Sequence, residues 1–487
     1  MAYNSLREFV ELLETRGQLV RITAPVSAEL EITEIVDRVS KGPAERNKAL
    51  LFENVTGYEM PVLINMFGNA ERMAWALGVD ELEDLRRNLE SLIDLRPPTG
   101  LRETLGRGAG LAQALRNAGL KPRIVPHPPV QAIVETETPT LDDIPILTCW
   151  PDDGGPFVTL PQVITRDPVK GTRNVGMYRL QKIDSRTLLV HWQRHKGGAE
   201  HERVAKELSQ PEIPAAIVLG GDPACIWSAS APLPPDIDEY WLAGWLRGRS
   251  VPFANCITQP LEVPATADIV IEGYVDPNEH LPEGPFGDHT GYYTPVERFP
   301  VFRVTAITRR RDPIYPATVV GIPPMEDYWM GKATERLFLP LVRLIAPEIV
   351  DFAMPAPGIF HNLVLVSIRK RFPGQAQKVI HALWGLALLS LAKAIVVVDD
   401  WVDVQNPMEV GWQALGNTDW SRDVTVTKGP VDQLDHASTM SVFGGKIGID
   451  ATAKLPEEGY SRGWPEVVSM HSEVKAKIDA LWEDLGI

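Results

Sequence analysis

The hydrophobic pattern of the chain changes twice, and this change constrains the fold more than any other feature. Between a Pro-rich stretch at 122–129 and about Thr308, short β-branched runs are separated by Gly, Pro and Asp turns. This spacing is typical of a barrel or a sandwich and not of β–α–β units. The runs are Val163–Thr165, Leu188–Val190, Ala215–Leu219, Ile269–Ile271 and Val301–Thr305. On either side, amphipathic helices alternate with short strands, which predicts α/β folding.

We therefore expect a multidomain α/β and α+β protein, because 487 residues exceed what one hydrophobic core usually organises. The expected parts are an α/β domain over 1–121, a β-rich domain over 122–315, and a linker plus α/β domain over 316–487. The outer domains are expected to hold helices from Ser5, at Ile32–Val39, at Gln375–Leu389 and at Met408–Leu415, with strands at Leu19–Ile22, Leu50–Phe52, Pro61–Asn65, Leu363–Ile368, Ala394–Val398 and Val424–Val426. The last domain is expected to be doubly wound and mostly parallel. Glu466–Leu485 reads as an amphipathic helix that docks on a neighbour.

Charge and cysteine usage narrow the class of function. A formal net charge of −16 argues against a general nucleic-acid or anionic-membrane surface, so an anionic ligand needs a local cationic site or a metal. The cysteines Cys149, Cys225 and Cys256 form neither a disulfide framework nor a zinc motif. The first residues show no basic-then-apolar signal, and no apolar run reaches membrane-spanning length. We expect a cytoplasmic protein without an integral membrane segment.

Two acids in a turn-rich loop are the clearest candidates for chemistry. Glu283 and Asp288 stand five residues apart in a run of Gly, Pro and Thr that ends at Tyr293. Such a loop can hold a defined shape, and paired carboxyls suit general acid–base work. A structural or calcium-like turn is the alternative.

Three other segments could bind a ligand or a metal. Asn174 offers a neutral oxygen ligand, and Arg179 offers a planar fork for a carboxylate, although both could be structural. His191 and His195 are four residues apart and could share a face and a metal, or lie on an ordinary surface. Asp236, Asp238 and Glu239 open a helix; they either cap it or complete an oxygen-rich site for Mn2+ or Mg2+ with Asn174 and a histidine.

Taken in order, these segments resemble the UbiD family of prenylated-FMN-dependent decarboxylases along nearly the whole chain. The resemblance is strongest to the bacterial 4-hydroxy-3-polyprenylbenzoate decarboxylases. The segments that carry it are Leu30–Ile35, Ile144–Pro151, Asn174–Arg179, Arg194–Gly198, Glu283–Tyr293 and Gly444–Thr452.

The resemblance implies an N-terminal α/β domain, a central split β-barrel like that of flavin reductases, and a C-terminal α/β domain that forms a dimer or hexamer. It assigns Asn174, His195 and Glu239 to Mn2+ or Mg2+, which tethers the flavin phosphate, and it places K+ near Ser228–Ala231. The residues expected to bind the flavin are Met177, Tyr178, Arg179, His191, Trp192, Gln193, Lys196, Gly197 and Lys446. A flavin prenyltransferase would supply the cofactor.

The implied reaction is reversible, non-oxidative decarboxylation of an aromatic, hydroxybenzoate-type acid or of an α,β-unsaturated acid, in quinone biosynthesis or aromatic-acid metabolism. Arg179, Glu283 and Asp288 match the catalytic network, with Asp288 as the proton donor. Burial beside another carboxylate should then raise the pKa of Asp288 toward neutrality, against the charge of Arg179.

Substrate contacts are expected from His289 and Ile322. His289 could hydrogen-bond a phenolic hydroxyl or be structural. Ile322 replaces the arginine associated with the polyprenylbenzoate enzymes, which puts their substrate in doubt. The alternatives in function are an FMN-dependent oxidoreductase on the same barrel and a flavin-storage protein without catalysis.

Overall fold

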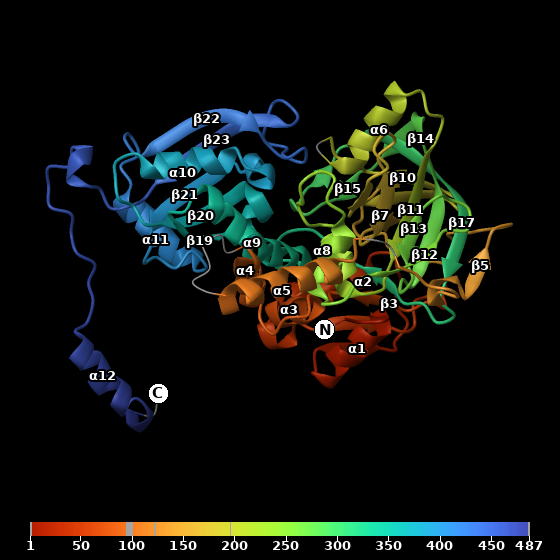
Figure 1. Ribbon diagram of the computed structural model, residues 1–487, viewed down its shortest axis with the longest axis horizontal. Coiled ribbons are helices and arrows are strands. Elements are labelled where there is room, and N and C mark those ends of the chain that lie inside the picture. The colour runs from red at the N-terminus through yellow and green to blue at the C-terminus, as the bar shows by residue number, and fades with distance from the viewer. Residues whose placement is uncertain (1, 94–100, 121–122, 195, 486–487) are drawn as a thin grey trace.

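The computed structural model describes residues 2–93, 101–120, 123–194 and 196–485. Its chain forms an N-terminal α/β part, a large central sheet and a C-terminal α/β part (Figure 1). The long helix α9 (Glu326–Ile345) lies at the junction of the C-terminal part with the other two. None of the helices in these ranges is long and apolar enough to cross a membrane.

The N-terminal part packs helices on a small sheet of order β1-β2-β3-β18. Its first helix begins where predicted, because the Ser5 side chain accepts a hydrogen bond from the Glu8 backbone N–H, and Leu6, Phe9 and Leu13 are buried on one face. The helices are α1 (Leu6–Thr15), α2 (Glu31–Lys41), α3 (Ala70–Ala76), α4 (Glu83–Leu92) and α5 (Leu101–Ala118). The strands are β1 (Leu19–Ile22), β2 (Ala49–Phe52), β3 (Val62–Ile64) and β18 (Tyr315–Ala317).

The central sheet has the order β6-β9-β10-β17-β14-β11-β7-β8, with β5 paired to β17. Its strands are β5 (Ile133–Glu135), β6 (Phe157–Val158), β7 (Gln162–Arg166), β8 (Arg173–Gly176), β9 (Leu180–Asp184), β10 (Thr187–Val190), β11 (Ile213–Leu219), β14 (Ile269–Glu283) and β17 (Glu297–Arg309). All five predicted runs lie in these strands. No pairing among the described strands closes the sheet, so the split-barrel geometry stays a prediction.

Smaller elements surround this sheet. The helices are α6 (Gly197–Glu207), α7 (Pro223–Ser228) and α8 (Glu239–Leu246), and the strands are β4 (Arg123–Ile124), β12 (Pro252–Asn255), β13 (Glu262–Pro264), β15 (Phe286–Gly287) and β16 (Tyr293–Thr294). The long strands β14 and β17 pair from Ile269↔Arg309 to Glu283↔Glu297, so the chain between them projects as a loop from one end of the sheet. This end of the sheet carries the acidic loop.

The C-terminal sheet has the order β19-β20-β21-β23-β22. Its elements are β19 (Ile349–Ala353), β20 (Leu363–Ile368), α10 (Gln375–Trp384), β21 (Ala394–Asp399), α11 (Pro407–Asn417), β22 (Val424–Pro430), β23 (Phe443–Asp450) and α12 (Ser472–Leu481). Only the two central pairings are parallel, and both edge strands pair antiparallel. The prediction of a mostly parallel sheet is therefore wrong at the edges, because no α-helix in the described chain connects β19 to β20 or β22 to β23.

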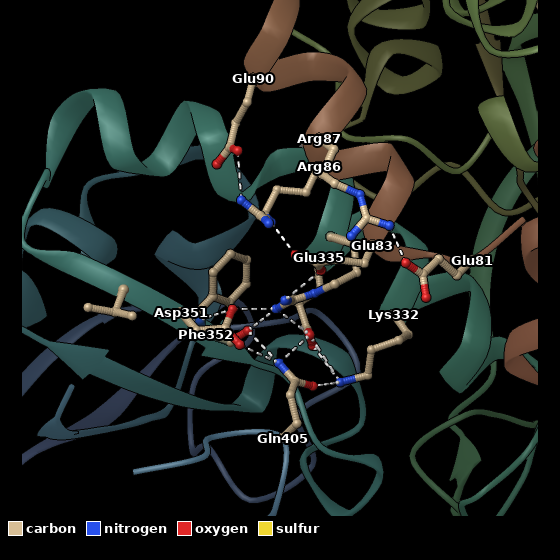
Figure 2. Close-up of polar contacts among 12 residues, drawn as sticks. Glu81, Glu83, Arg86, Arg87, Glu90, Lys332, Glu335, Asp351, Phe352 and Gln405 are labelled. Carbon is tan, nitrogen blue, oxygen red and sulfur yellow. Dashed lines mark hydrogen bonds and ion pairs between the residues drawn. The ribbon is translucent and has the colours of Figure 1, made fainter. Parts of the chain in front are cut away.

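A network of charged side chains joins α9 to the parts on both sides of it (Figure 2). Glu335 is fully buried and pairs with Lys332 at 2.9 Å and with Arg336 at 2.8 Å. Arg336 also reaches Asp351 of β19 at 2.7 Å. Two turns further along the same helix, Arg343 donates to Glu90 of α4 at 2.7 Å. These contacts fix the C-terminal part relative to the N-terminal part.

Candidate active site

The three residues expected to be catalytic meet in one buried cluster. Arg179 lies between β8 and β9, and its Nε and one Nη donate to the two carboxylate oxygens of Glu283 at 2.7 and 3.0 Å. The other Nη donates to Asp288 Oδ2. Thr294 Oγ1 accepts a fourth hydrogen bond from the guanidinium at 3.1 Å. The Arg179, Glu283 and Asp288 side chains are each 9% exposed or less.

Local structure gives the acidic loop its shape. Glu283 ends β14, and Gly284 follows with a φ of +94°, a conformation that favours glycine and turns the chain. The Gly284 backbone N–H donates to Gln181 Oε1 at 2.9 Å, and the Gly287 N–H donates to Asp153 Oδ1 at 2.7 Å. The Phe286 ring lies 4.6 Å from the Arg179 guanidinium carbon. The loop is thus held from β9 and from the segment before β6.

Glu283 is held as an anion. Burial alone would raise its pKa, but hydrogen bonds from His191 and Arg179 lower the pKa to about 2. His191 Nδ1 lies 3.2 Å from Glu283 Oε2, and its ring lies 4.1 Å from the ring of Phe299. Burial and the charge of Arg179 lower the pKa of His191, so this imidazole is neutral at neutral pH.

Asp288 is also an anion, which corrects the expectation of a raised pKa. Its Oδ1 accepts hydrogen bonds from the backbone N–H and from Nδ1 of His289, at 2.7 and 2.8 Å. Burial would raise the pKa of Asp288, but the positive charges of His289 and Arg179 hold it well below its usual range. Conversely, burial lowers the pKa of His289, and the charge of Asp288 raises it to about 9. The cations outweigh burial, so at neutral pH the proton of this pair lies on His289.

Most residues expected to line a flavin gather beside this cluster. Met177 and Tyr178 follow β8, His191, Trp192 and Gln193 follow β10, and Lys196 and Gly197 open α6. The Tyr178 hydroxyl accepts hydrogen bonds from the Gly198 N–H at 3.2 Å and from Asn174 Nδ2 at 3.3 Å.

Two buried nitrogens in this group suit a bound ligand. Trp192 Nε1 and His191 Nε2 have no hydrogen-bond partner in the described part of the chain. A side chain at Gly197 would place its Cβ 2.0 Å from Asn174 Oδ1, so the backbone here must stay bare. Buried polar groups need partners. Trp192 Nε1–H needs an acceptor, whereas Nε2 of the neutral His191, whose Nδ1–H donates to Glu283, needs a donor. A flavin ring system, which carries carbonyl acceptors and a ring N–H donor, provides both. The residues therefore fit a flavin.

Lys446 lies elsewhere, on β23. Its ammonium donates to the backbone oxygens of Ser390 and Ala392, and it lies 5.8 Å from the Trp384 ring centroid. These contacts all belong to the C-terminal part. A role of Lys446 at the flavin stays a prediction.

Two of the three expected metal ligands are neighbours. Glu239 opens α8, and its Oε2 accepts a hydrogen bond from the Val175 N–H, the residue after Asn174, at 2.8 Å. Burial raises the pKa of Glu239 to about 8, and Glu239 forms no ion pair within the described ranges. His195 lies outside these ranges, and no group of three His, Cys, Asp or Glu ligands occurs within them.

The donor set nevertheless suits cations. A buried carboxylate without an ion-pair partner gains from a cation, and a carboxylate with an amide oxygen suits Mn2+ or Mg2+. At the expected K+ position, the Ser228 hydroxyl is buried without a hydrogen-bond partner in the described chain, and the Met177 N–H donates to the Ala229 carbonyl oxygen at 2.8 Å.

The C-terminal part covers the far side of the acidic loop. The His289 ring lies 5.3 Å from the ring of Phe360, and Tyr292 lies 4.2 Å from His436. Ile322 is 63% exposed, and a Cβ at Gly291 would lie 3.1 Å from its side chain. Ile322 therefore lies against the loop that carries His289.

Sequence reasoning missed several residues that shape the site. Thr294 and Phe286 hold the guanidinium, Asp153 and Gln181 hold the loop, and Phe360 covers it. Gln181 stands two residues after Arg179, and strand alternation could have placed both on one side. The others carry no local signal, because their partners lie far away in the sequence.

Comparisons with known proteins agree with this fold. Models of the N-terminal, Rift-related and C-terminal domains of 3-octaprenyl-4-hydroxybenzoate carboxy-lyase match residues 10–92, 123–323 and 328–451. An uncharacterized protein of Aquifex aeolicus is 51% identical over 100% of this chain and 99% of its own.

Solved structures of two enzymes illustrate the similarity in fold. The UbiD-class enzyme HmfF from Pelotomaculum thermopropionicum in complex with FMN has a TM-score of 0.81 at 29% identity, covering 98% of this chain and 99% of its own. An evolved dimeric form of HmfF in complex with prFMN has a TM-score of 0.78 at 28% identity, with the same coverage. The closed form of vanillic acid decarboxylase from Sedimentibacter hydroxybenzoicus has a TM-score of 0.86 at 25% identity, covering 100% and 99%.

The matching family models and the fold define a carboxy-lyase. This chain belongs to the UbiD family.

Proposed function

We propose that the chain catalyses reversible, non-oxidative decarboxylation of an aromatic or α,β-unsaturated carboxylic acid with prenylated FMN. The observation that carries this proposal is the buried cluster in which Arg179 bridges Glu283 and Asp288. Support for the cofactor comes from the HmfF complexes with FMN and prFMN and from the unpartnered nitrogens of Trp192 and His191.

The prenylated flavin, when bound, supplies an electron-accepting ring for the electron pair that CO2 leaves behind. Tyr178, Trp192, Lys196 and Gly197 would hold the flavin beside Arg179. Mn2+ or Mg2+ at Asn174, His195 and Glu239, with K+ at 228–231, would bind its phosphate. A cation there lets a protein of net charge −16 hold an anionic group.

Arg179 orients the substrate. Its hydrogen bonds to Glu283, Asp288 and Thr294 use four of its five N–H donors. The remaining N–H can bind the substrate carboxylate, while Glu283 keeps the guanidinium from turning. Asp288, which accepts a hydrogen bond from the other Nη, donates a proton to the substrate carbon from which CO2 departs.

The substrate ring would lie between His289 and Ile322. His289 Nε2 can bind a ring hydroxyl, which suits hydroxybenzoate-type acids, and Ile322 offers an apolar contact. This matches a relative named for an aromatic acid, vanillic acid decarboxylase. Quinone biosynthesis and aromatic-acid metabolism both contain such acids.

The test is expression with a flavin prenyltransferase and Mn2+, followed by a screen of aromatic and unsaturated acids for CO2 release. We expect CO2 from at least one acid, and an Asp288→Asn variant that keeps its flavin absorbance but loses turnover. NAD(P)H-driven flavin reduction without CO2 from any acid would instead establish an oxidoreductase. Full activity of Asp288→Asn would remove Asp288 from the proton-transfer step.

A further inference from the structure

Asp288 has no proton of its own to give in this arrangement. Its Oδ2 accepts from Arg179, and its Oδ1 accepts twice from His289, through the backbone N–H at 2.7 Å and through Nδ1 at 2.8 Å. A carboxylate that accepts three hydrogen bonds, with cations on both oxygens, is stabilised as an anion. The nearest acidic proton is therefore on His289 Nδ1.

The surroundings favour a charged His289. Asp327, at the start of α9, and Asp432, in the connection between β22 and β23, face the imidazole, and their negative charges add to that of Asp288 in raising its pKa. The cation Arg179 lies on the other oxygen of Asp288. The His289 side chain is 17% exposed, and its ring lies tilted against that of Phe360, which screens the pair from bulk water.

We propose that His289 stores, as an imidazolium, the proton that Asp288 passes to the substrate carbon, so that the two side chains act as one donor. This inference rests on the proposed decarboxylation. It adds a proton source to that reaction and explains how Asp288 can donate a proton although it is ionised.

The proton balance closes without a further reagent. The C–C bond to the carboxylate breaks, its electron pair stays on the substrate carbon, and CO2 leaves. The Nδ1 proton moves to Asp288 Oδ1, and Asp288 then delivers that same proton to the carbon, which forms the C–H bond. His289 is left neutral and regains a proton from water, so the sum is one carboxylate and one proton converted to one C–H product and CO2.

A role limited to binding a substrate hydroxyl predicts different behaviour. Nδ1 is already bonded to Asp288, so only Nε2 could meet a hydroxyl. Loss of that bond would raise KM for hydroxylated acids alone. Loss of a proton store would instead lower kcat for every accepted acid.

The charge state can be measured without turnover. The protein carries ten histidines, so we would label them with 15N and record their ring signals from pH 5.5 to 10, with His289→Gln assigning the signal of His289. We expect His289 to remain an imidazolium at pH 7.5 and to titrate near 9, and Asp288→Asn to move its titration below 7. Titration of wild-type His289 at or below its ordinary value of 6.5 would overturn the proposal.

The proton-supply role is tested on the flavin-loaded enzyme. For His289→Gln we expect CO2 release in the first turnover at near the wild-type rate, slow formation of the C–H product, and a kcat lowered by about 10²–10⁴-fold. For acids without a ring hydroxyl, KM should change by less than about threefold. The matched control is His280→Gln, which removes a histidine bonded to Glu202 away from the site and should leave kcat unchanged. A raised KM with unchanged kcat would overturn the proposal.

The two experiments separate this inference from the proposed function. An active enzyme whose His289 is neutral at pH 7.5 contradicts the inference alone. A protein that releases CO2 from no acid, although His289 titrates near 9, contradicts the decarboxylation and reduces the pair to a structural contact.

Discussion

Arg179 is the side chain on which the site depends, because it neutralises two buried carboxylates at once. Arg179→Lys supplies a single ammonium that cannot pair in planar fashion with Glu283 and reach Asp288 as well. We expect kcat/KM for CO2 release to fall by at least about 10²-fold, because one buried carboxylate loses its partner and the substrate loses its orienting donor.

The matched control is Arg203→Lys on α6, where the arginine is 55% exposed and pairs with Glu200 and Glu207. This variant should retain wild-type activity, because exposed ion pairs contribute little. If Arg179→Lys keeps its activity within threefold of wild type, the bridging role assigned to the guanidinium is wrong.

The ion pair of His289 and Asp288 should make stability depend on pH in a definite direction. The pKa of His289 is raised from 6.5 to about 9 in the folded protein, so its contribution is complete below about pH 6.5 and is lost as the pH rises through about 9. The pH-dependent part is at most about 3 kcal/mol. Urea unfolding of wild type and His289→Gln should therefore differ most at pH 6 and converge above pH 9.

Asp288→Asn provides the control for that measurement, since it removes the charge that His289 pairs with. In this background, His289→Gln should cost about the same at pH 6 and above pH 9. A wild-type difference that does not change with pH would show that the pair is not charged.

These residues also show which contacts of the site can be predicted from the sequence alone. The adjacency of Asp288 and His289 is visible in it, but the sign of the pKa shift depends on Arg179, which lies 109 residues away from Asp288. Only the family resemblance joined Arg179 to Glu283. Thr294 and Phe286 were not predicted, since nothing in a local pattern shows which side chain will meet a guanidinium.

Helix α9 contacts both the N-terminal and the C-terminal part through ion pairs, and Glu335 is the centre of this charge network (Figure 2). Its carboxylate also accepts hydrogen bonds from the Met354 N–H at 2.7 Å and from Gln405 Nε2 at 3.1 Å. Glu335→Gln leaves Lys332 and Arg336 without this buried counter-charge. We expect a loss of about 3–5 kcal/mol, seen as a thermal midpoint lower by roughly 6–12 °C.

Glu34→Gln on α2 is the matched control, because Glu34 is 57% exposed and pairs only with Arg38 among the described residues. Its midpoint should stay within about 1 °C of wild type. An equal drop in both variants would mean that the buried network adds nothing beyond ordinary surface charge.

The helices and strands were predicted better than their pairing. Periodicity located α1, α2, β20 and β21, because each buries one face or is apolar throughout. It ended α10 too late, at Leu389, whereas the helix stops at Trp384 before Gly385. Periodicity is also silent on strand direction, so the antiparallel edges of the C-terminal sheet were not foreseen.

The C-terminal part contacts the central part through the connection between β22 and β23. The Arg194 N–H donates to Gln433 Oε1 at 3.3 Å, and Gln433 Nε2 donates to Glu297 at 3.2 Å. Together with the contacts of Phe360 and His436, they bring Asp432 toward His289. This arrangement places the negative charge of Asp432 near the His289 imidazole, where it helps to raise the pKa of His289.

The C-terminal arm, residues 465–485, packs against no other part of the described chain. Figure 1 shows α12 at the end of an extended stretch, away from the other parts, and residues 465–485 are all exposed. Val474, Ile478 and Leu481 nevertheless form an apolar stripe along α12. A ten-residue helix is marginal in water by itself, so this stripe needs a partner surface.

We expect that partner to be a second copy of the chain, as the sequence pattern of this helix predicts. Removal of residues 464–487 should lower the molar mass measured by light scattering on a sizing column, while circular dichroism still reports a folded protein. Ile478→Asp should act in the same direction, because a charge in the middle of the stripe opposes burial. Asp479→Ser, on the other side of the helix, should leave the mass unchanged. If the truncated and full-length chains elute with the same number of subunits, the arm does not hold the oligomer together.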